Sequence, residues 1–221
     1  TMLGETETWD SSSWTEVGDL NTDRHLLAGS GNVNTAAICM SGSDDGGTEK
    51  LTNVEIWNGS NWTEVGEVNV GRWAGSGAGT SASALFYGGG NSPSYLTSTE
   101  SFDGTSWTEV ADLSTGKNMA SGVPSGTSSA ALSAGGQSPV VATSEEWNAP
   151  ATFRQFNVGD IYYNADPSSG VIKYVGYGTG AWASGGTISN SRTTHASFGT
   201  QTANIISGAL DVDHCESYDG S

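Results

Sequence analysis

Basic residues and cysteines are scarce in this sequence, and no long apolar run occurs in it. Seven Lys and Arg stand against 24 Asp and Glu, a formal net charge of −17 over 221 residues. Because nucleic acids and anionic membranes attract cations, this balance argues against both as partners. No segment approaches the roughly 18 apolar residues of a membrane-spanning helix, and no basic-then-apolar leader opens the chain. We therefore expect neither nucleic-acid binding nor membrane insertion.

The two cysteines give little information about metal binding or disulfide pairing. Cys39 and Cys215 are 176 residues apart and match no metal-binding spacing. A buried Cys39 thiol and a Cys39–Cys215 pairing are both compatible with the sequence. The 32 glycines exceed the usual share, but the eight tryptophans argue against disorder, since a chain so rich in large rings can bury them.

One segment recurs along the chain. It reads Glu-x-aromatic, a short turn, then Trp-Thr-Glu-Val, and its glutamates are separated by 48, 45, 45 and 71 residues. A basic residue follows the second tryptophan by ten residues in each copy, which identifies Trp182 as the second tryptophan of the fourth. Trp147 and Trp182 therefore flank an insertion of 30 residues. The repeated glutamates are Glu7, Glu55, Glu100, Glu145 and Glu216, and the basic residues are Arg24, Arg72, Lys117 and Arg192.

Each copy predicts four strands. The Glu-x-aromatic and Trp-Thr-Glu-Val segments form an outer hairpin, and a small-residue strand (74–79) followed by an apolar strand (82–90) exemplifies the inner one. Four strands in about 45 residues, with the smallest residues innermost, are typical of β-propeller blades. We expect one all-β domain over 1–221, with four or five blades of four antiparallel strands, almost no helix and an inserted β-hairpin at 149–180.

The chain begins and stops inside an outer hairpin, which leaves two interpretations. The first hairpin completes the last blade and closes a ring, or the chain is a piece of a longer array. We favour the closed ring, because an open array leaves strand edges unpaired.

Glycine pairs precede the aromatic turns. Gly89-Gly90 comes before Phe102-Asp103 and Trp107, and Gly135-Gly136 comes before Trp147-Asn148, although Ser41-Gly42 and Gly208-Ala209 keep one glycine each. In this pattern the sequence resembles the kelch-repeat family of β-propellers, over nearly the whole chain except roughly 149–180. More loosely, the Trp-Thr-Glu-Val copies and the segments 158–164 and 172–176 resemble repetitive structural proteins of marine bacteriophages.

The repeat predicts structural roles for most of its aromatic and charged residues. We expect the glutamates to occupy one environment in every unit, with the basic residues as candidate ion partners. The aromatic residues at repeat positions, which we expect to pack, are Trp9, Trp14, Trp57, Trp62, Phe102, Trp107, Trp147, Trp182 and Tyr218.

Two places lie outside the repeat. Trp73 stands where the other units have His25, Asn118 and Thr193, and it is a candidate for stacking on a sugar or for local packing against Arg72. The insertion predicts a β-hairpin with a proline turn, either a site of partner contact or a fibre-like junction between runs of repeats. Its candidate binding residues are Tyr162, Tyr163, Tyr174 and Tyr177.

Catalytic and metal sites have little support. The histidines are His25, His195 and His214, of which His25 and His195 occupy neighbouring repeat positions. Copper oxidases that resemble this fold use tyrosine and histidine ligands, but here neither a third imidazole beside these two nor a His-x-x-x-His spacing supports a metal. The loops at 44–45 and 211–213 offer carboxylates, as a calcium site or as solvated turns. No Gly-x-Ser-x-Gly elbow is present. We expect no catalytic residue, metal or cofactor.

The sequence thus predicts a non-catalytic structural or binding module. The phage resemblance implies a virion-associated appendage, such as a tail fibre or host-contacting protein, located on the virion or outside the cell. Its partners would be proteins of a larger assembly or a host-surface receptor or glycan, and it could be oligomeric. The alternatives are a glycan-binding, lectin-like propeller and an oxidase or lyase of the kelch type.

Overall fold

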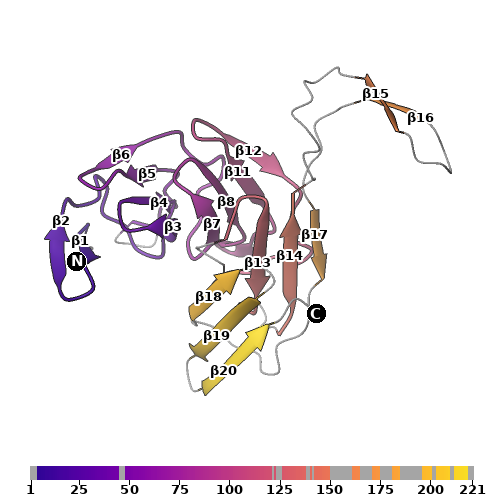
Figure 1. Cartoon of the computed structure of the whole chain (residues 1–221). Helices are drawn as coiled ribbons and strands as arrows, with labels where there is room; N and C mark the ends of the chain where they lie inside the picture. Colours follow the sequence, from indigo (N-terminus) through magenta and orange to yellow (C-terminus); the bar gives the residue numbers. More distant parts are fainter. Residues whose placement is uncertain are drawn as a thin grey trace.

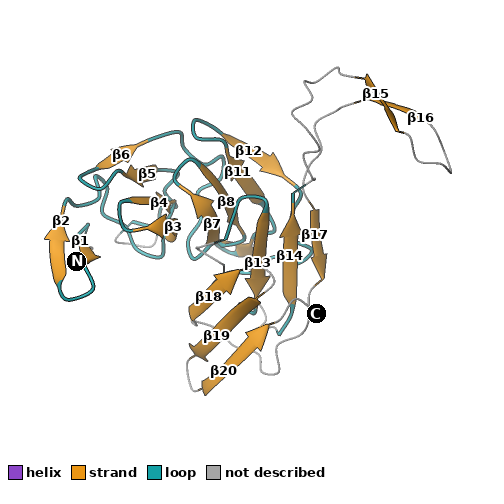
Figure 2. Cartoon of the chain, in the orientation of Figure 1, coloured by secondary structure: helices purple, strands orange, loops and turns teal. Residues whose placement is uncertain are grey.

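The computed structural model contains strands and no helix among its described residues, as Figure 2 shows. The all-β class expected from the sequence is confirmed. In the described part of the chain there is accordingly no helix long and apolar enough to span a membrane. Side chains are described over 4–44, 48–120, 122, 126–137, 140 and 142–149. Over the strands at 161–164, 171–174, 181–184, 196–200, 203–209 and 212–218 the backbone alone is described, except that the exposed Ser217 is described in full.

Two sheets contain four antiparallel strands each. The first consists of β3 (Ala28–Val33), β4 (Ala36–Met40), β5 (Val54–Trp57) and β6 (Trp62–Glu64), paired in that order. The second consists of β7 (Ser76–Thr80), β8 (Ser83–Tyr87), β11 (Thr99–Phe102) and β12 (Trp107–Val110), also in that order. The hairpin of β9 (Gly90–Asn91) and β10 (Ser94–Tyr95) connects β8 to β11. In these two units, the four strands that the repeat predicts form one sheet.

The other sheets have fewer strands. The first hairpin pairs β1 (Thr6–Trp9) with β2 (Trp14–Val17). A three-stranded sheet contains β13 (Ala130–Ala134), β14 (Ser144–Asn148) and β17 (Ala181–Ser184), and the last contains β18 (Ala196–Thr200), β19 (Ala203–Ala209) and β20 (Val212–Tyr218). Figure 1 shows these sheets following one another along an arc.

The inserted segment lies between two paired strands of one sheet. β14 pairs directly with β17, with Trp147 opposite Trp182. Between them in the sequence come β15 (Ile161–Asn164) and β16 (Val171–Tyr174), which within the described backbone pair only with each other.

The apolar core lies between successive sheets. Because neighbouring residues of a strand point to opposite faces, β8 contributes Phe86 to one cluster and Leu85 and Tyr87 to another. The first cluster joins the two four-stranded sheets and includes Ile38, Met40, Val54, Val68, Phe86, Phe102 and Trp107. The second joins the next pair of sheets and includes Ala78, Leu85, Tyr87, Leu113, Ala131 and Trp147.

Backbone hydrogen bonds link three successive units at equivalent residues. The amide of Ala74 donates to the carbonyl of Leu26 (2.7 Å), and the amide of Met119 donates to the carbonyl of Ala74 (2.9 Å). Each of the three stands two residues after its basic residue and has a left-handed φ, between 50° and 53°. This conformation is costly for a residue with a side chain, so its recurrence shows that the three units join in the same way.

The first strands of neighbouring sheets approach closely, which explains the small residues in them. A Cβ atom on Gly77 of β7 would lie 2.5 Å from the Met40 Cε and 3.1 Å from the Gly29 carbonyl oxygen of β3. Glycine is therefore required at this position by the packing of β7 on β3.

Candidate functional site

The charged residues of the repeat meet as buried ion pairs in three units. Arg24 pairs with Glu55, Arg72 with Glu100 at 2.7 Å, and Lys117 with Glu145 at 3.1 Å. In each pair the basic residue comes from the segment that leads into a sheet, and the glutamate comes from the strand of that sheet that begins the outer hairpin, β5, β11 or β14. The pairs therefore tie the entry of each sheet to its outer hairpin.

The glutamates are also held by the chain just before the basic residue. Glu55 accepts hydrogen bonds from the backbone and side-chain nitrogens of Asn21 (2.8 and 2.7 Å), and Glu100 does the same with Asn69 (both 2.7 Å). Glu145 accepts one from the backbone amide of Ser114 (2.7 Å). These hydrogen bonds leave the buried carboxylates with few acceptor sites for a substrate.

Burial affects the basic partners directly. It lowers the pKa of Arg72 to about 10, while Glu100 opposes this shift. The pKa of Lys117 is lowered for the same reason, and its Nζ lies near Glu145 without hydrogen-bond alignment. Arg72 also lies 4.1 Å above the centre of the Phe86 ring, a cation–π contact that contributes to the core.

In the second and third outer hairpins, the paired aromatic residues contact the preceding unit. Phe102 and Trp107 stack with ring centres 4.9 Å apart, and they share a core cluster with Val54 of the sheet before them. The Trp107 indole N–H donates to the Gly66 carbonyl of that sheet's last loop (2.9 Å). Trp62 likewise donates to the Thr6 hydroxyl in the first hairpin (3.1 Å). This arrangement is an aromatic interface that repeats from unit to unit.

The first hairpin differs from the others in exposure. Trp9 and Trp14 have ring centres 5.4 Å apart, much as in the other pairs, but they are 44% and 64% exposed. Their counterparts Trp57, Phe102 and Trp107 are buried. The exposed pair of Trp9 and Trp14 is the most distinctive surface feature among the described residues.

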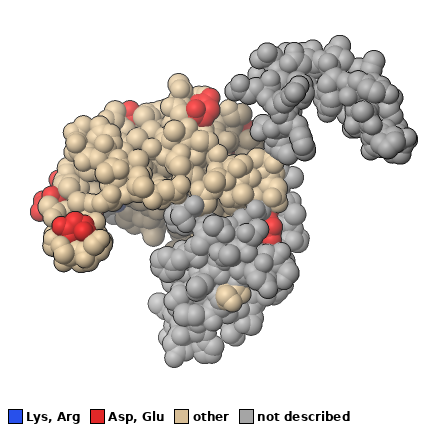
Figure 3. All heavy atoms as spheres, in the orientation of Figure 1, with Lys and Arg blue, Asp and Glu red and all other residues tan. Residues whose placement is uncertain are grey.

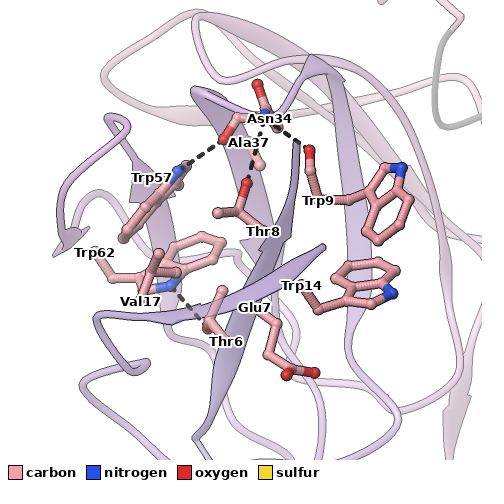
Figure 4. A pocket seen from close by; sticks show the side chains of 10 residues that line it. All are labelled: Thr6, Glu7, Thr8, Trp9, Trp14, Val17, Asn34, Ala37, Trp57 and Trp62. Atoms are coloured by element: carbon pink, nitrogen blue, oxygen red, sulfur yellow. Dashed lines mark hydrogen bonds between the residues drawn. The ribbon is translucent and has the colours of Figure 1, made fainter. Parts of the chain in front are cut away.

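A hollow of about 420 Å³ surrounds this hairpin where it meets the first four-stranded sheet. In Figure 4, Thr6, Thr8 and Val17 point toward Trp57 and Trp62, whereas Trp9 and Trp14 project from the opposite side of the hairpin. Where the two four-stranded sheets meet, Val54 and Ile56 occupy the positions that Thr6 and Thr8 have in the first hairpin. The interface between the first hairpin and the first four-stranded sheet is therefore filled less completely. Asn34 links the two elements by donating to the Thr8 hydroxyl (3.2 Å) and the Trp9 carbonyl (3.3 Å).

Trp73 is half-buried and packs locally. A Cβ atom on Gly90 would lie 2.7 Å from the Trp73 ring, and the backbones of the two residues exchange hydrogen bonds of 3.0 and 2.8 Å. The ring therefore covers the end of the glycine run 88–90, which is a packing role.

Some of the remaining candidate site residues lie in the described part of the chain, and others lie outside it. His25 is exposed beside Ser43, with which it forms a backbone bridge. Cys39 is a free thiol whose pKa burial raises to about 12. Among the described residues, no three His, Cys, Asp or Glu side chains lie close enough to hold a metal ion. Tyr177, Arg192 and His195 lie outside the described residues, as do the side chains of Tyr162, Tyr163, Tyr174, Trp182, Glu216 and Tyr218.

The surface of the described residues is acidic. Three of their four Lys and Arg side chains are buried in the ion pairs, which leaves Lys50 as the exception. Figure 3 shows Asp and Glu scattered over one face of this part rather than gathered in one patch. The sequence suggested the basic residues as ion partners of the repeated glutamates, and three such pairs lie among the described residues. The expectations that Trp9 and Trp14 pack, and that Glu7 has the same environment as the other glutamates, were wrong, because all three side chains are exposed. Sequence reasoning did not identify the exposed pair, because exposure depends on which unit lies beside each hairpin.

Comparison of the chain with protein-family models and with curated protein sequences gave no match.

Proposed function

We propose that the chain is a β-propeller of the kelch type, in which the four-stranded sheets are blades. The observation that carries this proposal is the backbone link from Met119 to Ala74 and from Ala74 to Leu26. A link that repeats between equivalent residues relates each unit to the next by the same step, as blades are related about an axis. The contact of β3 with β7, the first strands of successive sheets, supports the same arrangement.

The module we propose is non-catalytic. Its buried acids and bases are paired with one another and with backbone amides, and they stabilise the sheets. The indole groups of Trp62 and Trp107 are likewise used between units, where their N–H groups are hydrogen-bonded. A scaffold that uses its polar groups in this way is suited to act through its surface, as a structural or binding module.

The larger assembly that we propose is a virion, in keeping with the resemblance to repetitive structural proteins of marine bacteriophages. The chain would be an appendage, such as a tail fibre or another host-contacting part, with protein neighbours or a host-surface receptor as partners. The exposed Trp9 and Trp14 support a docking role, because exposed apolar patches mark interaction sites.

Immuno-electron microscopy of purified virus particles tests the proposal, with mass spectrometry of the same fraction. The proposal predicts that the protein copurifies with particles and that the label lies at a fixed place on the tail or its fibres. Recovery of the protein only from the soluble fraction, with unlabelled particles, would contradict it.

A further inference from the structure

We propose that the ion pair of Lys117 and Glu145 is a binding site for one buried water molecule, held between its charged groups and the Ser133 hydroxyl. The three side chains come from the segment before β13, from β14 and from β13, and each residue is no more than 3% exposed. The chain offers no hydrogen-bond partner to Lys117 Nζ, Glu145 Oε1 or Ser133 Oγ. Because an unpaired buried polar atom is destabilising, such atoms in native proteins are nearly always bonded to protein or to ordered water.

The residue that faces the buried glutamate across the sheet differs between units. It is Phe86 opposite Glu100, and it is Ser133 opposite Glu145. In the first case the aromatic ring lies 4.1 Å from the Arg72 guanidinium and fills the space beside the ion pair. The exchange of phenylalanine for serine removes a whole aromatic ring, which is larger than a water molecule.

The basic residue also changes, and its hydrogen bonds change with it. The Arg72 guanidinium donates to Glu100 and to two backbone carbonyls (3.2 and 3.4 Å). Lysine has one side-chain nitrogen where arginine has three, so Lys117 offers fewer donors to the equivalent acceptors. Among the described residues, the buried side-chain atoms without a hydrogen-bond partner are Arg72 Nε and atoms of the Lys117 unit, the side-chain amide of Asn118 included.

The charges of the site favour a neutral molecule that both donates and accepts hydrogen bonds. A bound cation would be repelled by the Lys117 ammonium, and a bound anion by the Glu145 carboxylate. Water can accept from Lys117 Nζ, donate to Glu145 Oε1 and form a third hydrogen bond with Ser133 Oγ, and three are typical of buried water. Ser133 and Glu145 are direct cross-strand partners, so their Cβ atoms are about 5 Å apart, a separation that one water molecule can bridge.

A crystal structure of the full chain, at a resolution that shows ordered water, tests the proposal directly. We expect a density peak within about 2.7–3.2 Å of Lys117 Nζ, Glu145 Oε1 and Ser133 Oγ. The Arg72–Glu100 pair is the internal reference, because an aromatic ring fills that site, and we expect no peak between its charged groups. A crystal soaked in thallium(I) distinguishes water from a monovalent cation, since only a cation site gains an anomalous signal.

Lys117→Arg should displace the water molecule. Its guanidinium would have the carbonyls of Ser133 and Thr143 as acceptors, which are equivalent to the two carbonyls that Arg72 uses. Oxygen-17 relaxation dispersion in solution counts long-lived internal water molecules, and we expect the count to fall by about one in this variant. Lys50→Arg is the matched control, because it makes the same exchange at a lysine outside the ion pairs and should leave the count unchanged. Circular dichroism of each variant establishes that it is folded.

Three results would overturn the proposal. The density peak could be absent, with Lys117 Nζ bonded directly to Glu145 and Ser133, or the peak could gain the anomalous signal of thallium. A folded Lys117→Arg variant could also retain as many internal water molecules as the wild type. The wild-type crystal structure decides the question even where the variant does not fold. The proposed virion role is independent of all three results, because it depends on the surface of the chain.

Discussion

Removing the charge of Glu100 tests the role of the buried ion pairs. The side chains of Arg72 and Glu100 are 0% and 2% exposed, and the carboxylate also accepts two hydrogen bonds from Asn69. Because the pKa of Arg72 is about 10, its guanidinium stays charged at neutral pH. Glu100→Gln keeps the shape of the side chain but leaves this buried charge unpaired. Breaking a buried ion pair in this way costs about 3–5 kcal/mol, a large part of the 5–15 kcal/mol typical of a whole domain.

The assay is urea-induced unfolding, followed by tryptophan fluorescence and by circular dichroism so that both probes report one transition. Glu109→Gln is the matched control, since Glu109 lies directly opposite Glu100 in the hairpin but is exposed. We expect it to change the free energy of unfolding by less than about 0.5 kcal/mol. The double variant Arg72→Met with Glu100→Leu should recover most of the loss, because it removes both charges.

Two results would refute this reasoning. A loss below about 1 kcal/mol for Glu100→Gln would mean that Arg72 is solvated or paired elsewhere. A double variant as unstable as the single one would mean that the shape of the pair, rather than its charge balance, stabilises the sheet.

Four further predictions follow from the repeat and its exceptions. Trp107→Ala should lower the free energy of unfolding by about 3–5 kcal/mol, since Trp107 is a buried core residue, whereas the same change at the exposed Trp14 should cost less than about 1 kcal/mol in urea titrations. The pKa of Asp103 is lowered by the backbone amides of Ser106 and Thr105, so its contribution to stability is present above about pH 4 and is lost as the pH falls through the lowered value. Asp103→Asn should therefore reduce the loss of stability at acid pH, with little change in stability at pH 7. An unchanged loss of stability at acid pH in this variant would exclude the role. The pKa of Cys39 is raised to about 12. In a Cys215→Ser variant, Cys39 should therefore react with a thiol reagent at pH 8 at least about 100-fold more slowly in the native protein than in urea. Equal rates would contradict its burial. Deletion of 150–179 leaves four residues between Trp147 and Trp182, as between Trp57 and Trp62. The variant should therefore unfold cooperatively in a thermal scan. Loss of the transition would show that the insertion is part of the fold.

The repeat predicted the local structure well because each unit encodes its own strands. The outer hairpin register, with Trp57 opposite Trp62, follows from the spacing of the turn. The recurrence of a glutamate and a basic residue in every unit likewise suggested the basic residues as ion partners. It did not predict that Arg24 pairs with Glu55 rather than Glu7, because this choice depends on which hairpin joins which sheet.

Properties that depend on neighbouring units could not be predicted in the same way. Trp9 and Trp57 stand at equivalent positions, yet one is exposed and the other buried. Trp73 is off-pattern in the sequence, which suggested a ligand contact, but Gly90 provides the space into which its ring packs. In both cases the burial of the ring depends on a contact with another element, so the sequence around each tryptophan contains no signal for it.

The most direct test of the central claim is an experimental structure of the isolated chain, by crystallography or electron microscopy. The account predicts sheets arranged radially about one axis, with β3 and β7 nearest to it and one ion pair of the Arg72–Glu100 kind in each complete blade. Sheets stacked face to face without a common axis would contradict it.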